Sequence, residues 1–130
     1  MEPRVMKEVR DNNGDIVRSA RPGEWTRATS PETAQMVKDL MVEVAERGTA
    51  VNARIPGVQV AAKTGTAQTG TDPNGENLLH AWLISFAPAD DPKVAVAVIL
   101  ENQPGFDDTT GGRLAAPIAQ TMMKTALGIG

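Results

Sequence analysis

The sequence predicts an α+β fold in which an antiparallel sheet is flanked by helices, one before it and one after it. Strand-like runs rich in Val, Ala, Ile and Leu follow one another at 58–62, 81–87 and 93–100. Helical patterns fall outside this block, on either side of it. Such segregation of strands from helices is typical of α+β proteins, whereas α/β proteins alternate the two.

The N-terminal residues predict a β-hairpin. Short strand-like runs at 4–10 and 15–19 flank Asn13-Gly14. This dipeptide supplies the positive φ angles of a tight turn. We therefore expect two short antiparallel strands at the start of the chain.

A first helix is predicted to begin at Pro31. Ser30 can cap the free N–H groups, proline suits the first helical position, and Glu32 favours the positive end of the helix dipole. Arg47 in the last turn and Gly48 after it mark the end of the helix. The side chains predicted to form its buried stripe recur at helical spacing and are Val37, Leu40, Met41 and Val44.

The predicted sheet begins with VQVAA at 58–62, a buried strand that runs into Lys63. A long polar loop at 69–79 leads to the second buried strand, 81–87. The turn PADDP then leads into 93–100. This short link and the β-branched content favour an antiparallel hairpin for the last two strands.

A second helix is predicted over 113–127, after the loop at 101–112. Pro117 is tolerated only near its first turn, because proline has no N–H to donate. The side chains predicted to lie on its apolar side are Leu114, Ile118, Met122 and Ala126.

Length, charge and composition narrow the class of protein. The 130 residues suffice for one domain or part of one. The net charge of −3 and the scattered basic residues argue against a nucleic-acid surface, which needs a clustered basic face. The absence of cysteine excludes a disulfide framework and thiolate metal sites. No apolar run approaches the roughly 20 residues that span a bilayer, and the N-terminus has no apolar signal core.

The stretch AAKTGTAQTG at 61–70 carries the main functional signal. A phosphate-binding loop is one hypothesis, but Ala62 replaces the second glycine of that motif, and the residues after Lys63 form a poor helix. A second hypothesis places Lys63–Thr66 on a strand edge that lines a catalytic cleft. A third is that Lys63 ends a strand and the threonines lie in a solvated turn.

The strand-edge hypothesis makes a geometric prediction. Thr64 and Thr66 would point to one face, because side chains alternate along a strand, and both hydroxyls could meet one anionic group such as a carboxylate. Gly65 would let a substrate approach the backbone closely, and an N–H on such an edge can stabilise an oxyanion. Lys63 would point to the opposite face unless the strand twists there or the side chain bends round the end of the neighbouring element.

Longer stretches carry a resemblance to a known family. They are RVMKEVRDNNGDIV at 4–17, ERGTAVNARIPGVQVA at 46–61, AAKTGTAQ at 61–68, HAWLISFAPADDPKVAVAVILE at 80–101 and GGRLAAPIAQTMM at 111–123. Together they resemble the end of the transpeptidase domain of class B penicillin-binding proteins, in particular those of the actinobacterial penicillin-binding protein A type. The resemblance covers nearly the whole chain.

The resemblance implies the serine penicillin-recognising fold shared with β-lactamases, with a five-stranded antiparallel sheet, helices on both faces and a helical subdomain. It implies a peptidoglycan D,D-transpeptidase that cross-links stem peptides by serine acyl transfer and is acylated by β-lactams, without a metal or cofactor. A D,D-carboxypeptidase or a β-lactamase could share the short motif, and the long match favours the transpeptidase. The implied location is the extracytoplasmic face of the bacterial cytoplasmic membrane, through an N-terminal anchor absent from these residues.

By resemblance, Lys63-Thr64-Gly65 is the third of the family's three catalytic motifs. Lys63 would supply positive potential and help order the proton transfers. Thr64 and Thr66 would hold the carboxylate of the peptide or the antibiotic, and the Thr66 N–H would form part of the oxyanion hole. Gln68 would touch the substrate.

The other two motifs are absent. Ser19, Ser30 and Ser85 are the only serines, and none fits Ser-x-x-Lys or Ser-x-Asn. Residues 1–130 are therefore expected to be the C-terminal portion of a transpeptidase domain without its nucleophile-bearing portion. Such a chain would expose one sheet face, and would depend on its missing N-terminal part or on self-association. The alternative is a catalytically inert structural or interaction lobe.

Three further features are interpreted as structural. His80, the only histidine, is assigned a surface or packing role. Asp90-Asp91 and Asp107-Asp108 lie in turns without a third ligand at suitable spacing, so no metal site is expected. Trp82 lies on a predicted buried strand, and core packing is expected for it.

Overall fold

The computed structural model describes residues 5–21, 23, 26–105 and 109–130. The chain divides into two units, residues 1–34 and 35–130, and each is described by itself. Arg4, at the start of the predicted hairpin, and Asp107-Asp108 lie outside the described residues.

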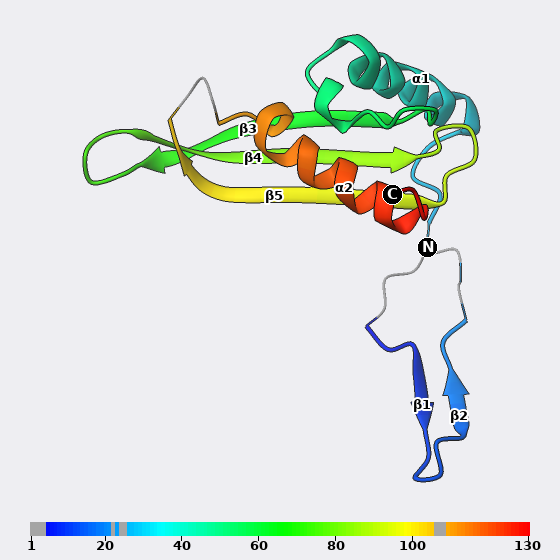
Figure 1. The fold of residues 1–130 in the computed structure, drawn as a ribbon. Coiled ribbons are helices and arrows are strands. Elements are labelled where there is room, and N and C mark those ends of the chain that lie inside the picture. Colours follow the sequence, from blue (N-terminus) through cyan, green and yellow to red (C-terminus); the bar gives the residue numbers. More distant parts are fainter. Residues whose placement is uncertain (1–4, 22, 24–25, 106–108) are drawn as a thin grey trace. The chain divides into compact units, whose positions relative to one another are not determined.

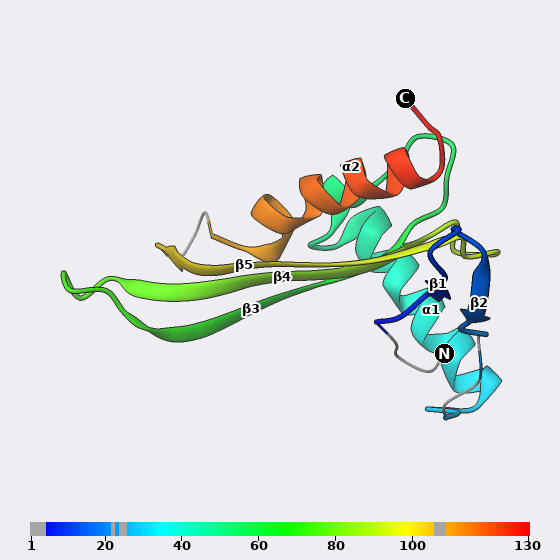
Figure 2. The ribbon, with the colours of Figure 1, turned by 90° about the horizontal axis from the view of Figure 1, so that it is seen from below.

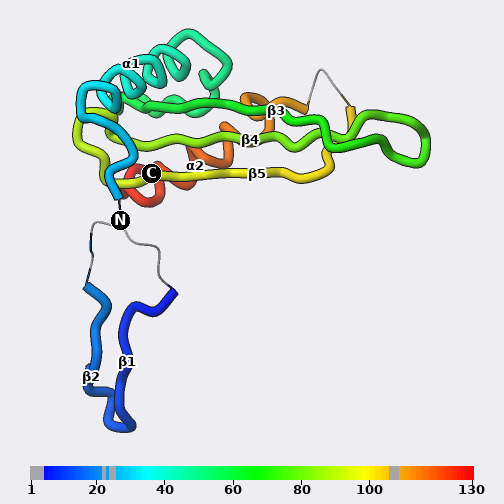
Figure 3. Tube along the Cα trace, turned by 180° about the vertical axis from the view of Figure 1, so that it is seen from behind, coloured from blue at the N-terminus to red at the C-terminus, as the bar shows by residue number. Residues whose placement is uncertain are grey.

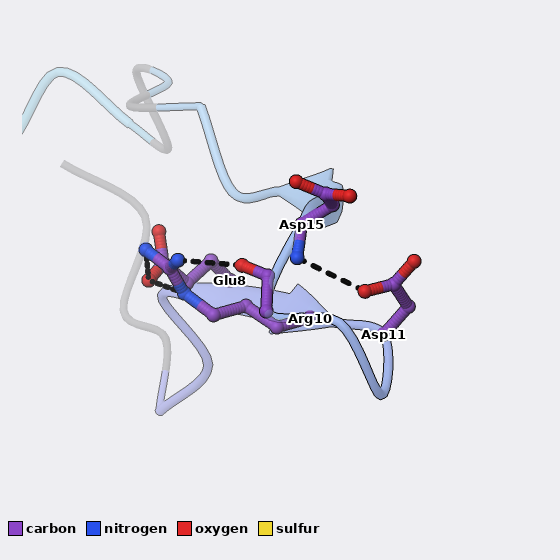
Figure 4. Close-up of polar contacts among 5 residues, drawn as sticks. Glu8, Arg10, Asp11 and Asp15 are labelled. Atoms are coloured by element: carbon purple, nitrogen blue, oxygen red, sulfur yellow. Dashed lines mark hydrogen bonds and ion pairs between the residues drawn. The ribbon is translucent and has the colours of Figure 1, made fainter.

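The first unit contains the predicted hairpin, which is confirmed. Strand β1 (Glu8–Arg10) pairs antiparallel with β2 (Ile16–Ser19). The Asp11 carboxylate accepts the Asp15 N–H at 2.9 Å and so closes the turn. Gly14 has the predicted positive φ, +90°, but Asn13 does not, and the connection spans residues 11–15, so the turn is wider than the Asn-Gly signal predicts. Figure 4 shows the turn together with the exposed Arg10–Glu8 ion pair.

Helix α1 spans Pro31–Arg47, as the sequence predicts at both ends. The Ser30 hydroxyl oxygen accepts the Thr33 N–H at 3.2 Å, and the Gly48 N–H donates to the Val44 carbonyl at 3.1 Å. The predicted buried stripe is wrong, however, because Leu40 is 68% exposed and only Ala45 in this helix is buried.

The position of the core explains this correction. An apolar stripe is buried only where a second element packs against it. In α1 only the end of the helix meets the core, where Ala45 is buried and Val44 is partly buried against it. Val37 is exposed like Leu40, and Met41 is half-buried.

The second unit is built on a three-stranded antiparallel sheet, in the order β3 (Ala61–Thr71), β4 (Asn77–Ala87) and β5 (Val94–Pro104) (Figures 1 and 3). The strands are longer than predicted. Residues 69–71 and 77–79 belong to strands, so the predicted polar loop shrinks to 72–76. The segment 58–60 lies outside the named strands.

The Asp72 carboxylate explains the short connection. It accepts N–H groups from Asn74 at 2.9 Å and from Glu76 at 2.8 Å, which closes a tight turn. The polar residues on either side of the turn then pair with one another across the strands. One such pair is Gln68 and Asn77, whose amide groups are hydrogen-bonded at 2.7 Å.

One face of the sheet is covered by the C-terminal elements (Figure 1). A π-helical turn, η2 (Gly111–Ala115), leads directly into α2 (Ala116–Ala126), with Pro117 in the first turn as predicted. The buried residues at this interface include Ala115, Ala116, Ala119 and Met123.

The predicted apolar side of this second helix is therefore wrong. Ile118 and Met122 are exposed, Ala126 is exposed and Leu114 is half-buried. The helix instead turns its small alanines toward the sheet, because short side chains allow the two backbones to approach closely. The larger apolar side chains are left on the outer side.

The opposite face of the sheet is open, and Figure 2 shows α2 on one side of the strands only. Trp82, Ile84 and Ile99 lie on this open face with 40%, 50% and 38% of their surfaces exposed. The expectation that Trp82 packs in the core is wrong, because alternation along β4 turns Leu83 inward and Trp82 outward. The expectation of an exposed sheet face is confirmed in the described part of the chain.

Candidate active site

The four residues Lys63–Thr66 lie within β3, which is an edge strand of its sheet. Thr64 pairs with Leu83 and Thr66 with Ala81, and both of these partners are buried on the face covered by α2. The two threonines therefore share that face, as alternation predicts. No helix follows the lysine, so the phosphate-binding loop is excluded. The solvated-turn reading is also wrong, because the strand continues to Thr71.

Lys63 lies on the open face of the sheet, in register with Ile84 of β4. Its side chain is exposed, and its ammonium group donates a hydrogen bond to the Thr64 carbonyl at 2.7 Å. Among the described carboxylates none forms an ion pair with it. The cation at this strand edge is thus available to an anionic partner.

Thr64 makes a contact that the sequence did not suggest. Its hydroxyl lies 2.6 Å from the hydroxyl of Thr49, which is in the segment between α1 and the 3-10 turn η1 (Val51–Ala53). The neighbouring Asn52 amide donates to the Gly112 carbonyl at 2.8 Å. Three distant segments of the second unit therefore meet at Thr64.

Gly111 and Gly112 make this convergence possible. A Cβ atom on Gly111 would lie 1.9 Å from the Trp82 carbonyl oxygen, and one on Gly112 would lie 2.0 Å from the Thr49 carbonyl oxygen. Contacts this close mean that any side chain at these positions would force the backbone to shift. The two glycines belong to a stretch that resembles the family, but only the structure shows which backbone each one approaches.

Thr66 and Gln68 line a hollow of about 300 Å³ together with Leu79 and Thr110. The hollow lies on the threonine side of β3, although the Gln68 amide is already hydrogen-bonded to Asn77. A larger groove of about 850 Å³ lies elsewhere, between the 51–59 segment and α2, and none of the β3 residues lines it. This groove is larger than the hollow beside Thr66, but none of the predicted site residues lines it.

Two of the remaining polar candidates, His80 and Asp91, have structural partners. The Asn102 N–H donates to Nδ1 of His80 at 3.1 Å, where a bulge interrupts the pairing of β4 and β5. Asp91 pairs with Lys93 in an exposed turn. Within the described part of the chain, no group of three or more His, Cys, Asp or Glu residues could hold a metal ion.

Comparison with protein families shows to which family the chain belongs. The family model for the penicillin binding protein transpeptidase domain matches residues 1–124. The chain belongs to the penicillin-binding protein transpeptidase family. Its α+β fold, with an antiparallel sheet and flanking helices, is the fold that membership implies.

Two relatives are the peptidoglycan D,D-transpeptidases PbpA of Mycolicibacterium smegmatis and Mycobacterium tuberculosis. The first is 44% identical over 127 residues, which is 98% of this chain and 26% of that protein. The second is 52% identical over 101 residues, which is 78% of this chain and 20% of that protein. The chain thus spans about a quarter or less of the length of these relatives.

Solved structures of transpeptidases superpose on the chain. A ceftriaxone acyl-enzyme complex of M. tuberculosis penicillin-binding protein A gives a TM-score of 0.81 at 43% identity, covering 92% of this chain and 26% of that one. The D,D-transpeptidase domain of a peptidoglycan glycosyltransferase from Eggerthella lenta gives 0.72 at 33% identity, covering 93% of this chain and 27% of that one. Within the described residues of the second unit the sheet has three strands, against the five that the family resemblance implies.

Proposed function

We propose that residues 1–130 form the C-terminal part of a peptidoglycan D,D-transpeptidase that cross-links stem peptides by serine acyl transfer and binds β-lactams. The observation that carries this proposal is the arrangement of Lys63–Thr66. On this edge strand the Lys63 ammonium, which pairs with none of the described carboxylates, lies on one face and the Thr64 and Thr66 hydroxyls lie on the other, in a chain that belongs to the transpeptidase family.

The chemistry assigned to each residue follows from its group. The Lys63 ammonium provides positive potential and helps order the proton transfers. The hydroxyls of Thr64 and Thr66 donate to the carboxylate of the stem peptide or the antibiotic. The Thr66 N–H contributes to an oxyanion hole, where fixed donors stabilise the charge that develops on the attacked carbonyl. Gln68, at the hollow beside Thr66, contacts the substrate.

The nucleophile comes from the missing part of the protein. In the reaction, a serine hydroxyl attacks the carbonyl carbon of the D-alanyl-D-alanine amide, and the terminal D-alanine leaves as an amine that carries the proton. An amine of a second stem peptide then attacks the serine ester and forms the cross-link. None of the serines of this chain fits Ser-x-x-Lys, so this chain contributes binding and electrostatic stabilisation.

The open face of the sheet is consistent with an active site shared between this chain and a part that carries the serine. Trp82, Ile84 and Ile99 form an exposed apolar surface on the side to which Lys63 belongs. The missing N-terminal part covers this surface in our proposal and brings the serine to Lys63. The assembled protein works on the extracytoplasmic face of the cytoplasmic membrane, through an anchor outside these residues. No helix in the described ranges is both long enough and apolar enough to cross a bilayer.

Mass spectrometry of the purified protein after incubation with a β-lactam tests the proposal. The expected result is a covalent β-lactam adduct on a Ser-x-x-Lys polypeptide that contains or accompanies this chain. Lys63→Ala should slow formation of the adduct by at least about 100-fold, as expected for loss of a proton-transfer group. If Lys63→Ala acylates at the wild-type rate, Lys63 has no such role. If no serine polypeptide is present and no adduct forms, the chain is an inert lobe.

A further inference from the structure

The contact between Thr49 and Thr64 joins a residue without an assigned role to one of the proposed carboxylate ligands. The two hydroxyl oxygens are 2.6 Å apart, a short distance for a hydroxyl pair. Thr49 is exposed and Thr64 is half-buried. The contact therefore lies at the rim of the proposed site rather than in the core.

The backbone around Thr49 is held from both sides. The N–H groups of Gly48 and Ala50 both donate to the Val44 carbonyl, at 3.1 and 3.2 Å. Ala50 is fully buried next to Thr49. The backbone that carries the Thr49 hydroxyl is thus held by the end of α1, independently of the strand that the hydroxyl contacts.

The turn before α2 closes on the same segment. Gly112 packs so tightly against the Thr49 carbonyl that a Cβ atom would lie 2.0 Å from it, and the Asn52 amide bonds to the Gly112 carbonyl. A threonine on a mobile loop would gain little by touching Thr64. A threonine whose backbone is fixed on both sides can hold a neighbouring hydroxyl in one orientation.

We infer that Thr49 is a positioning residue for substrate carboxylate binding by Thr64. This inference rests on the proposed function. A hydroxyl has one hydrogen to donate and two lone pairs to accept. When Thr64 donates its hydrogen to the carboxylate, its oxygen is free to accept the hydrogen of Thr49. The Thr49 hydroxyl thereby turns the Thr64 hydrogen toward the anion, and the chain of two hydrogen bonds strengthens the outer one.

A purely structural role predicts something different. If the hydrogen bond only stabilises the fold, its loss would affect every substrate equally. The positioning role instead affects only substrates that carry the carboxylate. The discriminating measurement is therefore the ratio of reaction rates with a charged and an uncharged ligand of the same shape.

The experiment uses the complete transpeptidase, that is, this chain together with the portion that carries Ser-x-x-Lys. Benzylpenicillin and its methyl ester are the two probes, and the second-order acylation rate constant is measured for each by intact-mass analysis. Thr49→Val removes the hydroxyl and keeps the shape. We expect it to lower the rate with the free acid about tenfold and to change the rate with the ester less than about twofold, which corresponds to loss of about 1.4 kcal/mol of carboxylate binding.

Four further variants complete the design, one of which, Thr64→Val alone, is the reference for the double variant. Thr49→Ser keeps the hydroxyl and should restore most of the preference for the free acid. Thr64→Val combined with Thr49→Val should be no worse than Thr64→Val alone, because Thr49 acts only through Thr64. Thr125→Val is the matched control, since it removes a threonine hydroxyl that bonds only to the α2 backbone. If Thr49→Val does not fold, Thr49→Ala takes its place.

The outcomes separate this inference from the proposed function. If Thr64→Val lowers the acid-to-ester ratio and Thr49→Val does not, the positioning role is wrong and the proposed function stands. An equal loss with acid and ester in Thr49→Val also overturns the positioning role. If Thr64→Val leaves the ratio unchanged, the proposed role of Thr64 fails, and the inference about Thr49 fails with it.

Discussion

The two faces of the β3–β4–β5 sheet have similar sequence patterns and different surroundings. The covered face buries Leu83 of β4 against a layer that contains Ala119 and Met123 of α2. The open face carries Trp82 and Ile84 from the same strand, both exposed. Apolar content alone therefore does not make a core. A side chain is buried only when another element is present to cover it. Helix α2 covers one face of the sheet, and its small residues let it pack closely there, whereas no described element covers the other face.

The proposed active-site groups are also divided between the two faces. Thr64 and Thr66 lie on the covered face, near the turn that precedes α2, and Lys63 lies on the open face. A site assembled from both faces of an edge strand is complete only when both sides have their partners. This chain supplies one partner, the η2–α2 layer, and we propose that the missing part supplies the other.

The largest effect is expected from breaking the covered face at Met123. This side chain is fully buried, whereas the adjacent Met122 is 49% exposed. Met123→Ala should lower the free energy of unfolding by about 2–5 kcal/mol through the lost burial and the cavity. Met122→Ala is the matched control and should change it by less than about 0.5 kcal/mol. Urea unfolding at fixed protein concentration measures both, and equal effects would contradict the assignment of the buried face.

A second break tests the close approach of η2 to the strands. Gly111→Ala places a methyl group 1.9 Å from the Trp82 carbonyl oxygen, so the backbone must shift. We expect a loss of about 1–3 kcal/mol of stability, as for overpacking in cores. Gly130→Ala is the control, because a Cβ atom there meets nothing within 4 Å. A Gly111→Ala protein that unfolds at the wild-type urea concentration would show that the approach is looser than described.

The open face can be tested by changing its exposed side chains. We expect the isolated chain to self-associate through this face, because exposed apolar patches drive association. Ile84→Gln should weaken that association about tenfold, equivalent to about 1.4 kcal/mol. Ile118→Gln, a similarly exposed isoleucine on α2, should leave it unchanged. Sedimentation velocity over a range of concentrations measures the dissociation constant, and a rigid monomer at all concentrations would refute the expectation.

The smallest effect on stability is expected away from both sheet faces, at the turn between β3 and β4. The hydrogen bond from the Glu76 N–H lowers the pKa of the Asp72 carboxyl below its ordinary value of 3.8. The ionised form is therefore favoured in the folded turn. Its contribution is complete above that ordinary value and is lost as the pH falls through the lowered pKa.

Amide hydrogen exchange of Asn74 and Glu76 below about pH 4 should report this loosening, while the amides of the strand core stay protected. Asp72→Ala should show faster exchange at these amides at neutral pH. In that variant the exchange rates, corrected for intrinsic pH dependence, should no longer change as the pH is lowered. If the turn amides of the wild type remain equally protected at low pH, the carboxylate does not hold the turn.

Local chemistry determined a large part of this structure. Asn13-Gly14 specified a hairpin, and Ser30 and Gly48 set both ends of α1, because each signal acts on its own backbone or on residues a few positions away. The alternation that places Thr64 and Thr66 on one face is likewise a property of any strand. For this reason the face that the two threonines share could be predicted from the sequence, although their contact partners could not.

The tertiary structure decided which apolar surfaces are covered. Both helices have apolar side chains on more than one side, so the sequence periodicity did not determine which side of each helix is buried. The predictions for Leu40 and Met122 were therefore wrong. Packing geometry settled the choice, since alanines let α2 approach the sheet where larger side chains could not. The contact of Thr49 with Thr64 and the closure of Gly112 on Thr49 depend on segments that are distant in sequence. No local pattern encodes such contacts, because they exist only after the chain has brought those segments together.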